Sequence, residues 1–208
     1  DFFAIVVVKQ LFGGLGYNFA NPAIVGRIAM AMGFAGRMSA YGFPADAVSS
    51  ATPLASSDKV DYVTLLLGNH GGVLGETCAI TLIIGGLYLI WTKVISPTIP
   101  VTYLATVAVL SLVSGRDPIY QLLSGGLMLG AFFMATDYVT SPTTRKGKIV
   151  FGIGLGVITC AIRFLGTMNE GVSFAILLMN LLVPYIEILT RQDRLGIAKT
   201  KKKEGAAK

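Results

Sequence analysis

Long apolar runs alternate with short polar segments along most of this chain. A helix needs about 20 predominantly apolar residues to cross a lipid bilayer. Five runs reach or approach that length, and each predicts a transmembrane helix: residues 74–91, 99–114, 120–136, 149–165 and 173–189. We therefore expect an all-α, polytopic integral membrane protein built as a helical bundle.

The region before residue 74 has shorter apolar segments. Residues 6–8 end an apolar stretch at the start of the chain, and residues 21–38 have a helical pattern. Asn21 can cap that helix, because Pro22 then occupies the first helical position, where its missing N–H costs nothing. Residues 60–67 are too short to cross a bilayer. They predict a half-helix that enters the membrane and returns at "GNHGG", inside protein or beside a cavity.

Composition favours lipid as the solvent of this chain. Hydrophobic residues make up 53% of it, charged residues only 13%, and the mean hydropathy is +0.69. Soluble domains usually contain about 25% charged residues. The net charge of +6 does not indicate nucleic-acid binding, because the basic residues cluster at the edges of predicted spans.

Basic residues also predict the orientation, since Lys and Arg accumulate in cytoplasmic loops. Residues 190–208 hold seven Lys or Arg, and the loop 140–148 holds three. Both segments are predicted to be cytoplasmic, the tail as an anchor at the anionic inner leaflet. Counting spans backward then places "GNHGG", and the polar stretch before it, on the extracytoplasmic side.

Glycine pairs recur before apolar runs, at residues 13–16, 71–75 and 125–130. Small residues permit close helix packing and broken helices in lipid. Broken helices in matching positions are typical of inverted-repeat transport proteins. None of the glycine clusters has the full spacing or the βαβ context of a dinucleotide-binding loop.

Charged residues inside or beside the spans are candidate site residues, because such groups are costly in lipid and need a partner or a cavity. Arg27 lies about one and a half turns into its predicted helix. Glu76 and Arg163 both lie near predicted outer helix ends. They either pair with each other, or one of them faces a polar ligand.

Two cysteines, Cys78 and Cys160, each lie in an apolar run, without Cys-x-x-Cys spacing. This excludes a four-cysteine cluster or zinc site built by this chain alone. Packing as small hydrophobic side chains is the simpler interpretation, and a disulfide is the alternative.

The stretch "DAVSSATPLASSD", residues 46–58, is rich in hydroxyl groups within an otherwise apolar chain. Taken alone, it is typical of a polar turn punctuated by Pro53. Its order of residues, however, resembles the motif Asp-x-x-Ser/Thr-Gly-Ala-Thr, at which a flavin transferase esterifies FMN through its phosphate to threonine. The motif maps onto Asp46, Ser49, Ser50, Ala51 and Thr52, with Ser50 in place of the usual glycine.

Four further segments resemble one family, in order along the chain. They are "KQLFGGLGYNFANPAIVGR", "GGVLGET", "GAFFMATDYVTSP" and "NEGVSFAILLMNLLVP". Together they resemble RnfD, a membrane component of the Rnf complex, which is an ion-translocating ferredoxin:NAD⁺ oxidoreductase. The related family is NqrB of the Na⁺-translocating NADH:quinone reductase. One departure is Tyr138, where the family pattern has proline.

The resemblance implies a fold similar to urea transporters, an inverted repeat with broken and re-entrant helices. Family members are longer at the N-terminus, so we expect an N-terminal part to be missing. Residues 1–38 would end the first repeat, and 39–73 would form the extracytoplasmic flavin-attachment loop and half-helix. Residues 74–190 would form the helices of the second repeat, and 191–208 the basic cytoplasmic tail.

The resemblance also implies the chemistry. Thr52 would carry FMN as a covalent phosphoester, in the inner membrane of a prokaryote. The implied cofactor-binding residues are Thr52, Asp46, Ser49, Ser50, Ala51, Pro53, Glu76, Thr77, Arg27 and Arg163. Some family members bind a noncovalent riboflavin, which no motif here establishes. No catalytic base and no metal ligand are expected in this chain.

The implied partners are other Rnf membrane subunits, including iron–sulfur subunits and a second covalent-flavin subunit. A flavin transferase would mature the protein, and Na⁺ or H⁺ would be the ion moved. Phe132 and Phe133 either form a hydrophobic constriction on the ion path or pack as core or lipid-facing aromatics. Two alternative functions stay open: a cofactor-free channel or transporter for a small solute, and a structural scaffold within a complex.

Overall fold

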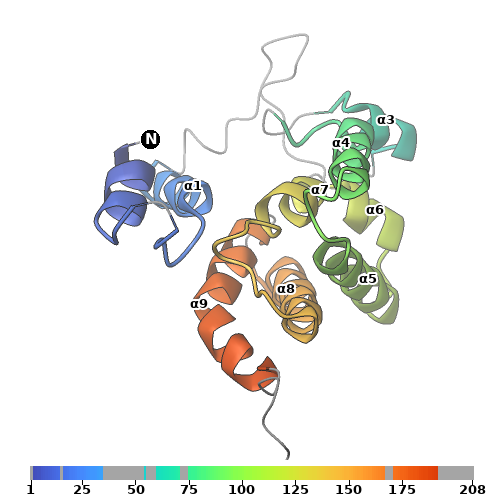
Figure 1. Cartoon of the computed structure of the whole chain (residues 1–208). Coiled ribbons are helices and arrows are strands. Elements are labelled where there is room, and N and C mark those ends of the chain that lie inside the picture. Colours follow the sequence, from blue (N-terminus) through green and yellow to red (C-terminus); the bar gives the residue numbers. More distant parts are fainter. Residues whose placement is uncertain are drawn as a thin grey trace, which may run out of the picture.

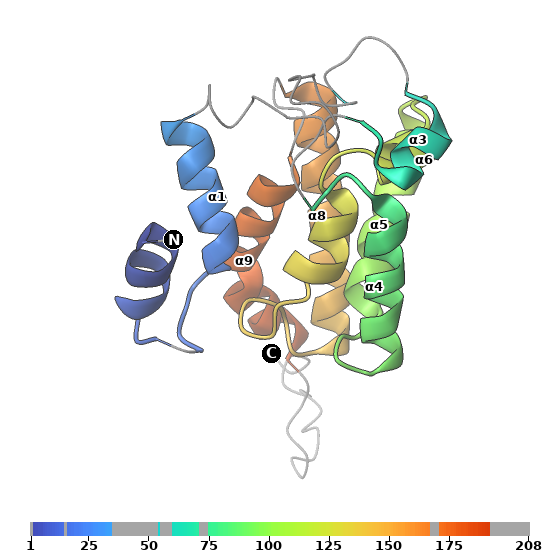
Figure 2. The same cartoon turned by 90° about the horizontal axis from the view of Figure 1, so that it is seen from above.

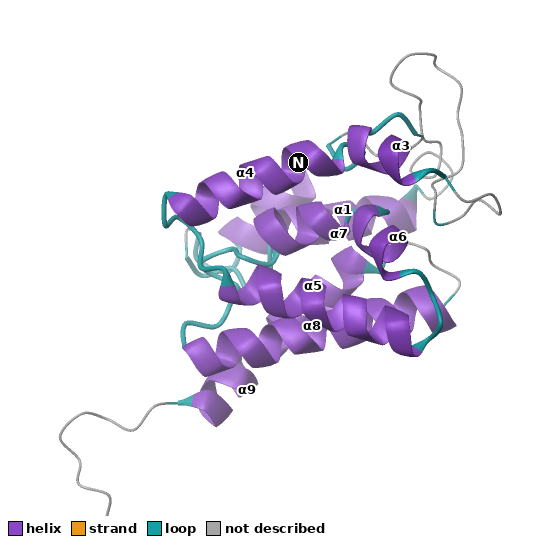
Figure 3. Ribbon diagram, turned by 90° about the vertical axis from the view of Figure 1, so that its right-hand side faces the viewer, coloured by secondary structure: helices purple, strands orange, loops and turns teal. Residues whose placement is uncertain are grey.

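The computed structural model describes residues 2–14, 16–34, 54, 60–70, 75–166 and 171–191. Within these ranges all regular secondary structure is helical (Figure 3). The elements are η1 (Phe3–Gln10), α1 (Pro22–Gly33), α3 (Tyr62–Leu67), α4 (Ala79–Trp91), α5 (Thr98–Val113), α6 (Pro118–Leu123), α7 (Leu127–Leu129), η2 (Gly130–Met134), α8 (Arg145–Leu165) and α9 (Val172–Thr190).

Helix α8 lies at the centre of the bundle, between α5 and α9 (Figure 1). Apolar side chains from all three helices form one core, in which Tyr103, Phe151 and Ile176 have no exposed surface. Cys160 is buried in the same core, and neither it nor Cys78 forms a disulfide. The predicted role of Cys160 as a small core side chain is therefore confirmed.

Glycines of α8 let α5 approach very closely. A methyl group on Gly156 would lie 2.5 Å from Thr106 Cβ, and one on Gly152 would overlap Thr102 Oγ1. These glycines are four positions apart in the sequence, so they lie on the same face of the helix. This is the small-residue packing expected of helices that associate in lipid.

The predicted single span over residues 120–136 is wrong, because the structure has a broken element there. Helix α6 ends at Leu123, Gly125 has a left-handed φ of +66°, and α7 then continues into the π-helix η2. A residue with this backbone interrupts the regular helical hydrogen bonds, and glycine adopts it without a Cβ penalty. A break at this glycine cluster is as predicted.

The neighbouring elements agree more closely with their predicted bounds. Asn21 caps α1, accepting the Ala23 N–H over 3.0 Å. The short helix α3 ends at Gly68, the first residue of "GNHGG", whose φ of +83° terminates the helix where the sequence predicted. The return of this segment through the membrane stays a prediction. Helix α4, in contrast, begins five residues later than predicted, at Ala79, because the preceding residues 75–78 are not helical.

Phe132 packs on α4 rather than lining an open path. Its side chain is 7% exposed, and a methyl group on Gly86 would overlap its ring. Together with Ile95 and Met128 it forms a second small core. The structure therefore supports the core alternative for Phe132, whereas Phe133 is 39% exposed beside Gly85.

The fold fits a helical membrane protein. Helices α8 and α9 are long and apolar enough to cross a membrane, and α1, α4 and α5 are shorter apolar helices. Large apolar side chains are exposed on the outside of the bundle, among them Ile84, Trp91 and Leu189. In Figure 2, α3 and α6 lie at one end of the bundle and the C-terminal end of α9 at the other. The inverted repeat and the four-part division of the chain stay predictions.

Candidate functional site at two facing helix breaks

Two helix breaks meet near the α3–α6 end of the bundle. One joins α3 to α4, and the other is the 124–126 turn between α6 and α7. Helix α3 contacts α6, and α4 contacts α7. The Glu76 carboxylate of the first break lies against Gly126 of the second break. A methyl group added to Gly126 would lie 2.8 Å from Glu76 Oε2. The missing side chain of Gly126 therefore makes room for a buried carboxylate.

Arg27 of α1 forms an ion pair with Glu76. The Glu76 side chain is 4% exposed and that of Arg27 is 22% exposed. The sequence suggested Arg163 as an ion-pair partner for Glu76. The structure instead pairs Glu76 with Arg27, which α1 places at the carboxylate. Such a pair offsets the cost of burying both charges, and removing one partner leaves the other uncompensated.

Arg163, near the end of α8, is bound to the second break. Its Nη1 donates to the Gln121 carbonyl over 2.8 Å, and its Nη2 donates to the Ser124 carbonyl over 3.2 Å. These carbonyls belong to the last turn of α6, where helical partners are missing. A methyl group on Gly125 would lie 3.1 Å from Arg163 Nη2. Arg163 therefore stabilises the end of α6, and a side chain in place of Gly125 would crowd its guanidinium.

The structure brings together three of the predicted site residues. Arg27 and Glu76 lie on one side of the Gly125–Gly126 turn, and Arg163 lies against the same turn. Thr77 follows Glu76 and is partly buried. The other six lie outside the described residues: Asp46, Ser49, Ser50, Ala51, Thr52 and Pro53.

Leu54 is the described residue that follows this stretch. A methyl group on Gly125 would lie 2.9 Å from Leu54 Cδ1. The Leu54 side chain therefore packs beside the α6–α7 break, next to Arg163. No pattern in the sequence indicates that residue 54 meets residue 125.

A cleft of about 270 Å³ lies at the starts of α3 and α6, the opposite ends of these short helices from the breaks, and is lined by Val60, Asp61, Tyr62 and Tyr120. Tyr62 donates its hydroxyl hydrogen to the Asp117 carboxylate, which links the two short helices. Asp117 also caps α6 by accepting the Ile119 N–H over 3.1 Å. Sequence reasoning missed this cleft, because nothing in the spacing relates residue 62 to residue 120.

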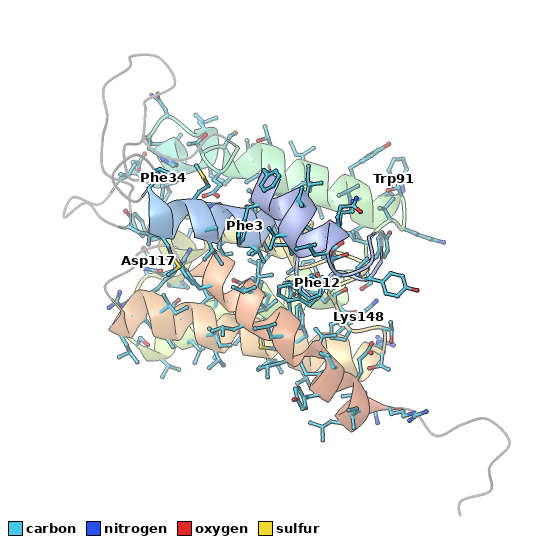
Figure 4. The ribbon with its side chains drawn as sticks, turned by 90° about the vertical axis from the view of Figure 1, so that its left-hand side faces the viewer. Phe3, Phe12, Phe34, Trp91, Asp117 and Lys148 are labelled. Carbon is cyan, nitrogen blue, oxygen red and sulfur yellow. The ribbon has the colours of Figure 1, made fainter. Side chains whose placement is uncertain are left out.

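Four labelled residues mark the two ends of the bundle. Figure 4 shows Asp117 and Phe34 at one end, and Trp91 and Lys148 at the other. Phe34 is the last described residue before residues 35–53, and the cleft-lining Val60 comes shortly after them. The polypeptide therefore leaves and re-enters the described bundle at the end that holds Asp117.

Together these features define the class, a helical membrane protein with broken elements and an internal ion pair. The model of the NQR2, RnfD, RnfE family matches residues 1–196, and the chain belongs to this family. The resemblance to RnfD is thereby confirmed at family level.

Curated relatives match nearly the whole chain. The D component of the Na⁺-translocating ferredoxin:NAD⁺ oxidoreductase complex of Acetobacterium woodii is 47% identical over 98% of this chain and 67% of its own length. The D component of the proton-translocating complex of Clostridium ljungdahlii is 41% identical over 94% of the chain and 67% of its own length. The D component of the ion-translocating oxidoreductase complex of Stutzerimonas stutzeri is 36% identical over 93% and 68%. The chain thus spans about two thirds of these relatives.

Proposed function

We propose that this chain is the FMN-carrying membrane subunit of an ion-pumping ferredoxin:NAD⁺ oxidoreductase of the Rnf type. The observation that carries the proposal is the stretch "DAVSSAT", an FMN-acceptor motif at residues 46–52, in a chain that belongs to the NQR2, RnfD, RnfE family. Relatives named as the D component of such complexes, at up to 47% identity, support membership of the same kind of complex.

Thr52 is the proposed attachment residue. Its hydroxyl oxygen would form the phosphoester with FMN, and a separate flavin transferase would make that bond, so the chain needs no base of its own for it. Bound FMN exchanges one or two electrons, and that chemistry belongs to the cofactor. The proposed role of this chain is to hold and orient the flavin and to provide the charged groups around it.

The residues near the attachment point fit an anionic, phosphate-bearing group. Two peptide units join Thr52 to Leu54, and two units span at most about 7 Å. Leu54 packs against Gly125, which is also adjacent to the guanidinium of Arg163. A cation at this position favours a phosphodiester nearby, because charge–charge interactions are strong where water is largely excluded.

We further propose that the flavin faces the extracytoplasmic side. Phe34 and Asp117 lie at the end of the bundle opposite Trp91 and Lys148 (Figure 4). The C-terminal end of α9 lies beside the start of α8, the helix that holds Lys148, because Thr190 and Thr144 are hydrogen-bonded over 2.8 Å, and the basic residues follow α9 in the sequence. Since basic residues accumulate on the cytoplasmic side, this arrangement favours a cytoplasmic C-terminus.

The remaining proposals concern the assembly. Other Rnf membrane subunits, including iron–sulfur and second covalent-flavin subunits, would deliver and accept electrons. The Arg27–Glu76 pair and the facing breaks are the proposed wall of a path for Na⁺ or H⁺, because charged groups and irregular backbone inside a membrane bundle occur beside such paths. The urea-transporter-like inverted repeat is proposed for the complete subunit.

Intact mass of the subunit tests the proposal directly. We expect a mass increase of one FMN less one water when the chain is produced together with a flavin transferase. The adduct and its in-gel flavin fluorescence after denaturation should vanish in Thr52→Val and persist in Thr77→Val. An unmodified Thr52 peptide in a sample made with active transferase would contradict the flavin role. Solute flux through liposomes holding this subunit alone would then favour the channel alternative.

A further inference from the structure

We propose that the cleft between α3 and α6 seats the isoalloxazine ring of the flavin attached at Thr52. The inference rests on the proposed function, and it adds where the ring lies and which side chains contact it. The contacting residues are Val60, Asp61, Tyr62 and Tyr120, which line the cleft.

The shape and lining of the cleft suit a flat conjugated ring. Its volume of about 270 Å³ is just below the usual range of whole ligand sites, about 300–1,000 Å³. It therefore suits the ring of the cofactor rather than a whole nucleotide. Two of its four lining residues are tyrosines, and aromatic side chains bind flat π-systems by offset or edge-to-face stacking.

Both tyrosines are held in place by neighbouring residues. Tyr62 donates its hydroxyl hydrogen to Asp117, the residue that caps α6. The Tyr120 hydroxyl is hydrogen-bonded to the Val60 backbone across the cleft. Each tyrosine is thus fixed by a residue beside the other short helix. Rigid aromatic side chains bind a ring at a low entropic cost.

A flavin attached at Thr52 would be close enough to reach the cleft. Leu54 packs against Gly125, which lies five residues beyond Tyr120 along α6 and its terminal turn. The Ser124 N–H donates to the Tyr120 carbonyl over 3.0 Å and closes the last turn of α6. One turn and one further peptide unit separate Tyr120 from Gly125, so their Cα atoms lie within about 10 Å of each other. The ribityl chain of FMN, with five carbons between phosphate and ring, can span this separation. The phosphate then lies on the Arg163 side and the ring between the tyrosines.

Tyr62 also has the exposure that a docking site needs. Its side chain is 43% exposed, although α3 and α6 already pack together at this point. Helices α3 and α6, whose first residues line the cleft, lie at one end of the bundle (Figure 2), and Phe34, after which residues 35–53 follow in the sequence, lies near Asp117 at that end (Figure 4). A ring attached within that segment would cover the exposed face of Tyr62.

Flavin fluorescence tests the ring position separately from attachment. A tyrosine in contact with a flavin quenches its fluorescence by electron donation to the excited ring, and phenylalanine does not. In protein whose FMN adduct is verified by mass, we expect weak fluorescence in the folded state and recovery after denaturation. The double variant Tyr62→Phe/Tyr120→Phe should fluoresce severalfold more strongly when folded. Its denatured intensity should equal that of the parent protein.

Matched controls separate contact from disturbance of the fold. Tyr185→Phe changes an exposed tyrosine on α9, far along the chain from the cleft, and should leave folded fluorescence unchanged. Val60→Trp fills the cleft and should make the ring more accessible to iodide quenching. The phenylalanine variants keep the ring shape, so a loss of folding is not expected from them.

The outcomes distinguish this inference from the proposed function. An FMN adduct of the correct mass, with equal folded fluorescence in the parent and the double phenylalanine variant, overturns the ring position and leaves the flavin role intact. Unchanged iodide quenching in Val60→Trp overturns it as well. Absence of the adduct from the parent protein overturns both proposals together.

Discussion

The α5–α8–α9 core and the region of facing breaks use glycine for opposite purposes. In the core, Gly152 and Gly156 lie inside a regular 21-residue helix and bring α5 into direct contact with it. In the region of breaks, Gly125 has a left-handed backbone and Gly126 makes room for the Glu76 carboxylate. Glycine stabilises one region by close packing and permits irregular backbone in the other.

The core is where the bundle gains stability from apolar burial, whereas the region of facing breaks is where buried charges lie. The core helices bury apolar side chains and few polar groups, such as the Tyr103–Thr159 hydrogen bond of 2.6 Å. The breaks hold an ion pair and an arginine bound to backbone carbonyls. Buried charge is a poor source of net stability, so its presence here points to a task other than folding. Substitutions in the two regions test this division directly.

The largest effect is expected from separating Arg27 and Glu76. Arg27→Met leaves the Glu76 carboxylate buried without this partner, and breaking a buried pair costs about 3–5 kcal/mol. Replacing both residues, in Arg27→Met/Glu76→Leu, should restore most of the stability, since neither charge of this pair is then left buried without the other. The unfolding midpoint in mixed detergent micelles measures both variants. If the double variant is no more stable than the single one, the ion pair is not the main interaction between these residues.

A methyl group at Gly125 should have the next largest effect. Left-handed backbone costs a non-glycine residue about 1–2 kcal/mol, and crowding against Leu54 and Arg163 should add about 1–3 kcal/mol. Gly115→Ala is the matched control, because Gly115 has nearly the same φ of +67° and no atom within 4 Å of the added methyl group. The difference between the two unfolding free energies isolates packing at the break. Equal destabilisation would mean that the contacts with Leu54 and Arg163 adjust freely.

A smaller effect is expected from Gly156→Ala in the core. The added methyl group would lie 2.5 Å from Thr106 Cβ, so α5 and α8 must separate, at a cost of about 1–3 kcal/mol. Gly154→Ala provides the comparison, since its methyl group meets the flexible end of Met179 instead. We expect Gly154→Ala to be nearly neutral in the same micelle assay. A larger loss in Gly154→Ala than in Gly156→Ala would refute the close α5–α8 packing.

The smallest effect is expected from Tyr103→Phe. It removes one partner of a buried hydrogen bond, and Thr159 is left with an unsatisfied hydroxyl, at about 1 kcal/mol. The double variant Tyr103→Phe/Thr159→Val should be close to the parent protein, because both polar groups are then absent. A double-mutant cycle on unfolding free energies gives the coupling between them. A coupling of zero would show that this bond adds nothing to the core.

The sequence identified many of the residues of the candidate site, but it did not predict how they are arranged. Arg27, Glu76 and Arg163 stood out because charges are rare in apolar segments. The sequence did not reveal which residues these charges contact. Arg27 and Glu76 are 49 residues apart and come together through the packing of α1 on the bundle. The cleft lined by Tyr62 and Tyr120 had no sequence signal at all. Its residues look like ordinary helix starts until α3 and α6 are placed together.

Hydropathy alone determined where apolar helices form, because the cost of unpaired backbone in lipid leaves few other structures for a long apolar run. It therefore predicted α5, α8 and α9 closely, and the cap at Asn21 followed from local chemistry. The glycine cluster at 125–130 indicated a possible break, but only the tertiary structure decided that the apolar run at 120–136 is interrupted, and that the interruption falls at Gly125. The reason is physical: an apolar run is compatible with lipid whether or not it is continuous. The break is set by contacts with residues from elsewhere in the chain, among them Glu76, Leu54 and Arg163, which lie against Gly125 and Gly126.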